Sequence, residues 1–121
     1  MARTRFVEHE GRQILFVDFA GLSDEADALA AIAESQAFVA QQPEGALLTL
    51  TDVTDMQFDE TVAKALWELM RHNKKRVRAG AVVGLSGERQ EDLYELLTHQ
   101  ARRDLPVFET AEEAKAWLVE Q

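Results

Sequence analysis

The sequence contains no cysteine, and this absence excludes several kinds of site. Without thiols the chain forms no disulfide bond, no thiolate metal centre and no cysteine nucleophile. No segment approaches the roughly 18 consecutive apolar residues that a membrane span needs. The first five residues, Met1 to Arg5, lack the apolar core of a signal peptide. We therefore expect a soluble, cytoplasmic protein without integral membrane association.

Positive charge is scarce relative to negative charge. The chain has 13 Lys and Arg residues against 22 Asp and Glu residues, which gives a formal net charge of -9. Because nucleic acids and anionic membranes are also negative, the molecule as a whole repels them, and we expect no nucleic acid partner. Hydrophobic residues make up 46% of the 121 residues, which suits one folded core. The sequence predicts a single domain over residues 1–121.

Hydrophobic patterning predicts an α/β fold. The segment from Phe6 to Phe19 has the pattern of a β-hairpin around a polar, glycine-containing turn. Its second strand is apolar almost without interruption from Ile14 to Phe19, as in a strand covered on both faces or one deep inside a sheet. Its first strand is expected at an edge. Further strands are predicted at 46–53, 79–85 and 106–108, and helices at about 24–41, from 59, at 86–104 and from 110. The order is ββαβαβαβα, which predicts a mixed, mostly parallel sheet with an antiparallel N-terminal edge strand.

One edge of this sheet is the candidate binding site. In a parallel α/β sheet, the carboxyl ends of the strands and the starts of the following helices lie at the same edge. The pattern therefore brings six residues to one rim, where a partner or ligand would bind: Asp52, Thr54, Asp55, Asp59, Ser86 and Gly87.

Three segments resemble the SpoIIAA-like, or STAS, family of small α/β domains, which occurs among anti-sigma-factor antagonists and is related to the CRAL-TRIO lipid-binding fold. They are ILFVDFAG at 14–21, LTLTDVTDM at 48–56 and HNKKRVRAGAVVG at 72–84. The resemblance is closest to an uncharacterised bacterial branch. It implies the SpoIIAA-like fold, with helices mainly on one face, and a non-enzymatic regulatory or binding module for a protein partner or small ligand. A carrier or sensor of a small lipophilic ligand is the alternative, and an enzyme, a metal-dependent or serine hydrolase, is third.

The phosphorylation switch of the classical antagonists is altered in this chain. Their motif has the form Asp-Ser-Ser-Gly after the second parallel strand, and the matching residues here are Gln57-Phe58-Asp59-Glu60. Asp59 takes the place of the phosphorylated serine, so the resemblance implies that serine kinases leave this position unmodified. Asp59 is either a helix N-cap, which residue preferences favour, or a mimic of the phosphorylated state. Thr54 and Thr61 are the neighbouring hydroxyls.

Two enzymatic alternatives depend on rim residues. Asp52, Asp55 and Asp59 would suit a hard cation such as magnesium if they met at one point, although aspartates are also common at strand ends and caps. Ser86 follows a strand, as in a nucleophile elbow, but Glu88 replaces the final glycine of that motif. The three histidines, His9, His72 and His99, have no spacing typical of a metal site. We therefore predict no catalytic residue, no metal site and no cofactor.

A basic cluster stands out against the acidic background. Five of the 13 basic residues fall within eight positions: Arg71, Lys74, Lys75, Arg76 and Arg78. Cations near a helix C-terminus interact favourably with the helix dipole, which is a structural explanation. The functional alternatives are an acidic partner, an anionic ligand or the acidic face of a second subunit.

The apolar second strand also favours self-association. If the helices cover one sheet face, the other face of the strand at 14–19 needs a cover, and a second copy of the chain would supply it. Trp67 and Phe38 lie off the apolar stripes of their helices, where aromatic side chains mark either helix packing or a partner contact. We expect a homodimer.

Overall fold

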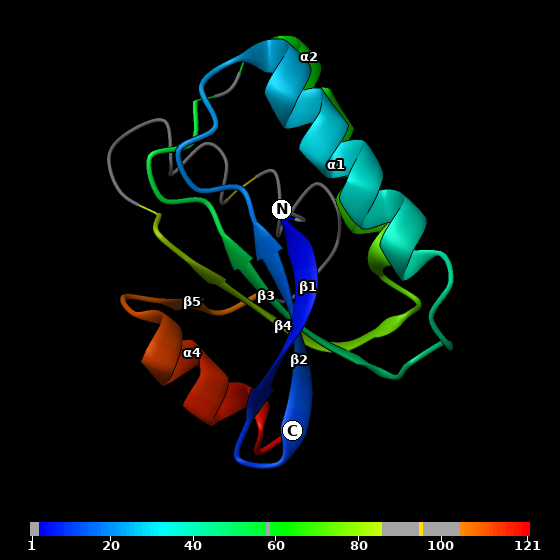
Figure 1. Ribbon diagram of the computed structural model, residues 1–121, viewed down its shortest axis with the longest axis vertical. Helices are drawn as coiled ribbons and strands as arrows, with labels where there is room; N and C mark the ends of the chain where they lie inside the picture. Colours follow the sequence, from blue (N-terminus) through cyan, green and yellow to red (C-terminus); the bar gives the residue numbers. More distant parts are fainter. Residues whose placement is uncertain (1–2, 58, 86–94, 96–104) are drawn as a thin grey trace.

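A five-stranded sheet with the order β1-β2-β3-β4-β5 forms the centre of the computed structural model, which describes residues 3–57, 59–85, 95 and 105–121 (Figure 1). The strands are β1 (Thr4–His9), β2 (Arg12–Asp18), β3 (Leu47–Asp52), β4 (Val77–Val83) and β5 (Val107–Phe108). β1 pairs antiparallel with β2, and every other neighbouring pair is parallel. The predicted mixed sheet with an antiparallel N-terminal edge strand is confirmed.

The described helices begin where cap chemistry predicts. They are α1 (Glu25–Val39), α2 (Glu60–Asn73) and α4 (Ala111–Leu118). The side chains of Asp24, Asp59 and Thr110 each accept a hydrogen bond from a backbone N–H in the first turn, which satisfies a donor that the helix itself leaves unpaired. The helix predicted at 86–104 lies outside the described residues, apart from Glu95, which is helical.

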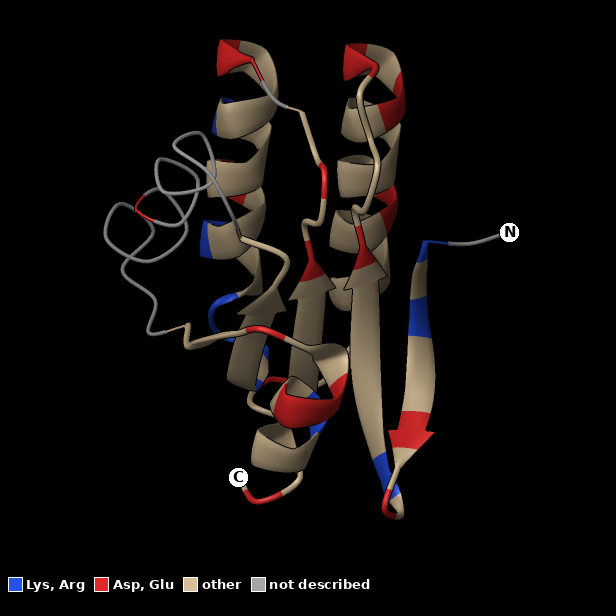
Figure 2. Cartoon of the chain, turned by 90° about the vertical axis from the view of Figure 1, so that its left-hand side faces the viewer, with Lys and Arg blue, Asp and Glu red and all other residues tan. Residues whose placement is uncertain are grey.

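The helices lie on both sides of the sheet. α1 and α2 pack against each other on one face, and α4 packs on β3, β4 and β5 on the opposite face. Figure 2 shows α4 in front of the strands and the two longer helices behind them. Among the described helices, α1 and α2 therefore share one face of the sheet, and α4 covers a second core on the other face.

The apolar middle of β2, from Ile14 to Val17, contributes to two cores. Leu15 and Val17 belong to the core beneath α1 and α2, whereas Ile14 belongs to the core beneath α4. Ile14, Leu15 and Val17 are thus buried on the two faces of the strand, whereas Phe16 is half-buried. Since α4 supplies part of the second cover, a partner subunit is not needed to explain the burial of Ile14, and the homodimer stays a prediction.

The two aromatic residues off the helix stripes have partners within the chain. The Phe38 ring on α1 meets the Phe6 ring on β1 edge-on, with centroids 5.5 Å apart. Trp67 on α2 is half-buried, and the guanidinium carbon of Arg71 lies 4.9 Å from the centre of its ring. These contacts favour packing within the chain as the explanation for both aromatic side chains.

Candidate binding rim

Two loops at the carboxyl edge of the sheet are bonded to each other. The loop at 19–24 joins β2 to α1, and the loop at 53–59 joins β3 to α2. The backbone N–H of Gly21 donates to the carbonyl oxygen of Thr54 at 2.8 Å, and the N–H of Gln57 donates to the carbonyl oxygen of Leu22 at 2.8 Å. We call the surface formed by these two loops and the first turns of α1 and α2 the rim. Its backbone is held in one arrangement by bonds between segments distant in sequence.

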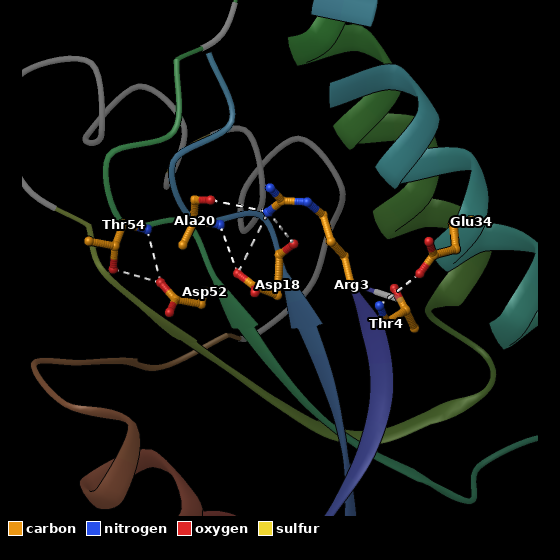
Figure 3. A network of polar contacts seen from close by, with 7 residues as sticks. All are labelled: Arg3, Thr4, Asp18, Ala20, Glu34, Asp52 and Thr54. Carbon is orange, nitrogen blue, oxygen red and sulfur yellow. Dashed lines mark hydrogen bonds and ion pairs between the residues drawn. The ribbon is translucent and has the colours of Figure 1, made fainter. Parts of the chain in front are cut away.

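Asp52 and Thr54 are brought together, as predicted, and they bond to each other. One carboxylate oxygen of Asp52, Oδ1, accepts hydrogen bonds from the Thr54 backbone N–H at 2.9 Å and from its hydroxyl at 2.6 Å (Figure 3). This aspartate turn bends the chain directly after β3. The Asp52 carboxylate therefore fixes the shape of the loop through Oδ1, which accepts both hydrogen bonds from Thr54.

Gly84, at the end of β4, allows this loop to approach. Its φ angle is +89°, in the left-handed region that favours glycine. A β-carbon at this position would collide with the Thr54 hydroxyl oxygen and would lie 2.7 Å from the Thr54 α-carbon. The close contact between Gly84 and Thr54 therefore depends on the missing side chain, a requirement that the sequence analysis did not recognise.

Asp55 and Asp59 are the exposed carboxylates of the β3–α2 loop. Asp55 has a φ of +56°, a left-handed conformation that aspartate tolerates better than most residues. Asp59 Oδ1 accepts a hydrogen bond from the Val62 N–H at 2.9 Å, so its predicted role as the N-cap of α2 is confirmed. A cap uses the oxygen of Asp59 and does not by itself require its charge.

Glu25, in the first turn of α1, is a rim residue that sequence reasoning missed. Two effects of Asp59 raise the pKa of Glu25. The larger is a side-chain hydrogen bond between the two residues, and the second is the negative charge of Asp59. The same hydrogen bond, together with the Val62 N–H, lowers the pKa of Asp59. The pair therefore holds a proton on Glu25 more tightly than an isolated glutamate would. The sequence does show acidic residues in the first turns of both helices, and this pattern could have indicated a contact between carboxylates.

Arg3 is the second residue that sequence reasoning missed. Its Nη1 donates to the carbonyl oxygen of Ala20 at 3.1 Å and to that of Asp18 at 3.4 Å, and it lies 4.0 Å from the Asp18 carboxylate (Figure 3). These bonds tie the beginning of the chain to the loop after β2. Arg3 therefore stabilises the backbone at the start of the β2–α1 loop. No sequence motif indicates this contact.

Comparison with known proteins places this architecture in a family. The profile of the SpoIIAA-like family matches residues 14–119. The chain belongs to the SpoIIAA-like family. A solved structure with this fold, an uncharacterised protein of the DUF3478 family from Shewanella loihica PV-4, is similar with a TM-score of 0.73. That protein is 18% identical in sequence, and the similarity covers 95% of this chain and 91% of the other. No curated protein matches this SpoIIAA-like chain.

The rim of this SpoIIAA-like domain does not assemble its carboxylates around one point. Among the described residues, no group of three or more His, Asp or Glu side chains could hold a metal ion. Asp52 and Asp59 instead bond to Thr54 and to the N–H of Val62. The magnesium alternative therefore gains no geometric support. Ser86 and Gly87, with the serine hydrolase alternative built on them, lie outside the described residues.

Two hollows lined by described residues both carry charged side chains. One, of about 250 Å³, lies beside the rim and is lined by Arg3, Leu22, Asp27, Ala30, Ala31 and Glu34. The other, of about 530 Å³, lies in the basic cluster at the far end of α2. The lining of the smaller hollow is mostly polar, which favours a polar ligand there over the lipophilic ligand of the CRAL-TRIO alternative. Within the described ranges, no helix is both long and apolar enough to cross a membrane.

Proposed function

We propose that this SpoIIAA-like domain is a non-enzymatic binding module whose rim takes a protein partner or small ligand that presents positive charge. The raised pKa of Glu25, caused first by a side-chain hydrogen bond with Asp59, carries this proposal. Asp24 caps α1 and Asp59 caps α2, so neither cap requires the Glu25 carboxylate. At neutral pH two neighbouring carboxylates repel each other, and a bound cationic group would relieve this repulsion.

The surroundings of the pair favour the same chemistry. Asp55 is exposed on the loop whose backbone is fixed to the neighbouring loop. In the described part of the chain, the ion pairs are Arg3 with Asp18 and Lys115 with Glu112. Neither neutralises Glu25, Asp55 or Asp59. A partner with Lys or Arg side chains, or a ligand with an amine, would supply the missing charge.

Native mass spectrometry of the protein freshly purified from its own host tests this proposal, because it reports the subunit count and any retained partner or ligand together. Asp55→Asn combined with Asp59→Asn keeps the shape of both side chains and an oxygen for the cap, while it removes two charges. We expect this variant to lose the retained molecule, with affinity at least about tenfold weaker. Glu8→Gln, on an exposed position of β1, is the charge-matched control and should retain it.

Two outcomes contradict the proposal. The first is full retention of the bound molecule by the variant without the Asp55 and Asp59 charges. The second is a protein that carries no partner or ligand in the native spectrum and gains none when basic proteins of the host are added.

A further inference from the structure

The basic cluster, formed by Arg71, Lys74, Lys75, Arg76 and Arg78, surrounds the turn between α2 and β4. Arg71, Lys74 and Lys75 line the open hollow of about 530 Å³ together with His72. Figure 2 shows acidic residues at the first turns of the two long helices and basic residues at the opposite end of α2. The hollow thus lies at the other end of the helix that Asp59 caps.

Within the described ranges, no carboxylate forms an ion pair with the cations of the hollow. In the part of the chain that the structure describes, none of the five cluster residues takes part in an ion pair. The C-terminus of α2 contributes a negative partial charge of roughly half an elementary charge, which is smaller than the three cations that line the hollow. The rim is roughly 20 Å away along the 14 residues of α2, about twice the distance over which salt screens charges. The cations that line the hollow are therefore unpaired among the described residues.

The walls of the hollow are held in place by local contacts. The guanidinium of Arg71 stacks over the Trp67 ring, 4.9 Å from its centre. The Gly45 N–H donates to the carbonyl oxygen of Lys75 at 2.9 Å, and the Leu47 N–H donates to that of Arg76 at 3.0 Å. The turn that carries the cations is thus fixed to the segment before β3. The Arg71 side chain and the backbone of the turn are therefore positioned before a ligand binds, which reduces the ordering that binding requires.

We propose that this hollow binds a small ligand carrying two or more phosphate groups. A guanidinium fork and two lysine ammonium groups are the donors that proteins use for phosphate oxygens. Three cations line the hollow, which matches the charge of such a ligand. A long polyanion would also meet the acidic remainder of the molecule, whose formal charge is -9, so the ligand is small. This site is independent of the rim and of its proposed partner.

Calorimetric titration with inorganic pyrophosphate and with tripolyphosphate tests the site. We expect saturable binding with a dissociation constant below about 1 mM at low ionic strength. Lys74→Gln combined with Lys75→Gln should weaken it at least about tenfold. Lys64→Gln is the matched control, because Lys64 is an exposed lysine of the same helix outside the hollow, and it should change affinity less than about twofold. All three lysines are exposed, so these changes leave the core intact.

A fluorescence titration locates the binding event. Trp117→Phe retains an aromatic ring beside Phe108 and leaves Trp67 as the reporter under Arg71. Pyrophosphate that engages Arg71 should change the Trp67 emission with the same dissociation constant that calorimetry gives. Arg71→Lys keeps the charge but loses the planar fork, so it should weaken binding of pyrophosphate.

Five results would overturn the proposal, of which the first four concern pyrophosphate binding and its specificity. These four are the absence of saturable binding up to about 10 mM pyrophosphate, an equal loss in Lys64→Gln, equally tight binding of inorganic sulfate, and unchanged binding by Arg71→Lys. Binding of an eight-residue glutamate peptide without binding of pyrophosphate would also overturn it, and would identify the cluster as a docking surface for an acidic protein.

Discussion

Gly84 joins the end of β4 to the β3–α2 loop through a contact that no other residue type permits. We expect Gly84→Ala to destabilise the fold by roughly 1–3 kcal/mol more than Gly11→Ala, because the new methyl group must displace Thr54. Gly11 is the control, since its φ of +81° is similar and a β-carbon there would meet nothing within 4 Å. Urea unfolding of both variants measures the difference. Equal costs would show that the loop moves aside freely.

Glu25 and Asp59 make opposite contributions to stability as the pH changes. The folded chain holds the Glu25 proton more tightly than the unfolded chain does, so stability falls as the pH rises from 4.5 through the raised pKa. The pKa of Asp59 is lowered, so its contribution is present above 3.8 and is lost as the pH falls through the lowered pKa. The pair therefore contributes most to stability between pH 3.8 and pH 4.5, the ordinary pKa values of Asp59 and Glu25.

Glu25→Gln should separate these contributions. The glutamine amide can donate to Asp59 without adding a second negative charge, so we expect the variant to melt at a higher temperature than the parent at pH 7. The advantage should shrink as the pH falls through the raised pKa of Glu25, where Glu25 of the parent becomes protonated. Asp27→Asn, in the same helical turn, is the control and should show no gain, because Asp27 interacts favourably with the helix N-terminus. A constant difference across this pH range would contradict the assignment.

At the scale of single elements, α4 closes the second core. Leu118 is fully buried against residues of the sheet, so we expect Leu118→Ala to lower the free energy of unfolding by roughly 2–5 kcal/mol. Val107→Ala on β5 should cost less than about 1 kcal/mol, because that side chain is 40% exposed. Chemical denaturation measures both. A small effect of Leu118→Ala would mean that α4 is only loosely docked.

Helix starts could be predicted from the sequence because cap chemistry is local. Asp24, Asp59 and Thr110 each bond to a backbone N–H two or three residues later in the chain. The face that α4 covers could not be predicted in this way, since an apolar stripe shows that a helix is buried but not on which side of the sheet. The two-sided burial of β2 was the indirect signal, and the sequence analysis interpreted it as the mark of a partner subunit.

At the rim, too, strand direction is visible in the sequence but side-chain partners are not. Asp52, Thr54, Asp55 and Asp59 could be placed at one edge because the direction of parallel strands determines it. The partners of these side chains, and the contact with Glu25, depend on how two loops and two helices pack. Such contacts join residues distant in sequence and leave no periodic pattern.

At the scale of the whole molecule, charge is separated along α2. The net charge of -9 indicates only that the protein is acidic. The sequence adds that five basic residues lie within positions 71–78, but not where they lie in space. The fold adds that acidic first turns lie at one end and the basic hollow at the other. A molecule of this kind can attract partners of opposite charge at its two ends, which overall composition would not suggest.

The homodimer is the remaining prediction at this scale, and the edge strands are where we expect it to form. Among the described residues, the exposed large hydrophobic side chains are Phe6 and Val107, each 40% exposed, and they lie on β1 and β5. An edge strand offers unpaired backbone groups to a neighbour, and β1 has six residues against two in β5. Antiparallel pairing of two β1 strands would join the sheets of two copies around a twofold axis.

Light scattering from about micromolar to hundred-micromolar concentrations decides this prediction, since a stable interface persists over that range. We expect a mass twice the 13.6 kDa of one chain. Phe6→Glu should give the monomer mass, because the twofold axis would bring two new charges together, while circular dichroism confirms that the variant is folded. Val107→Glu is equally exposed on the opposite edge and should remain a dimer. A monomeric parent would refute the dimer, and dissociation by Val107→Glu alone would move the interface to β5.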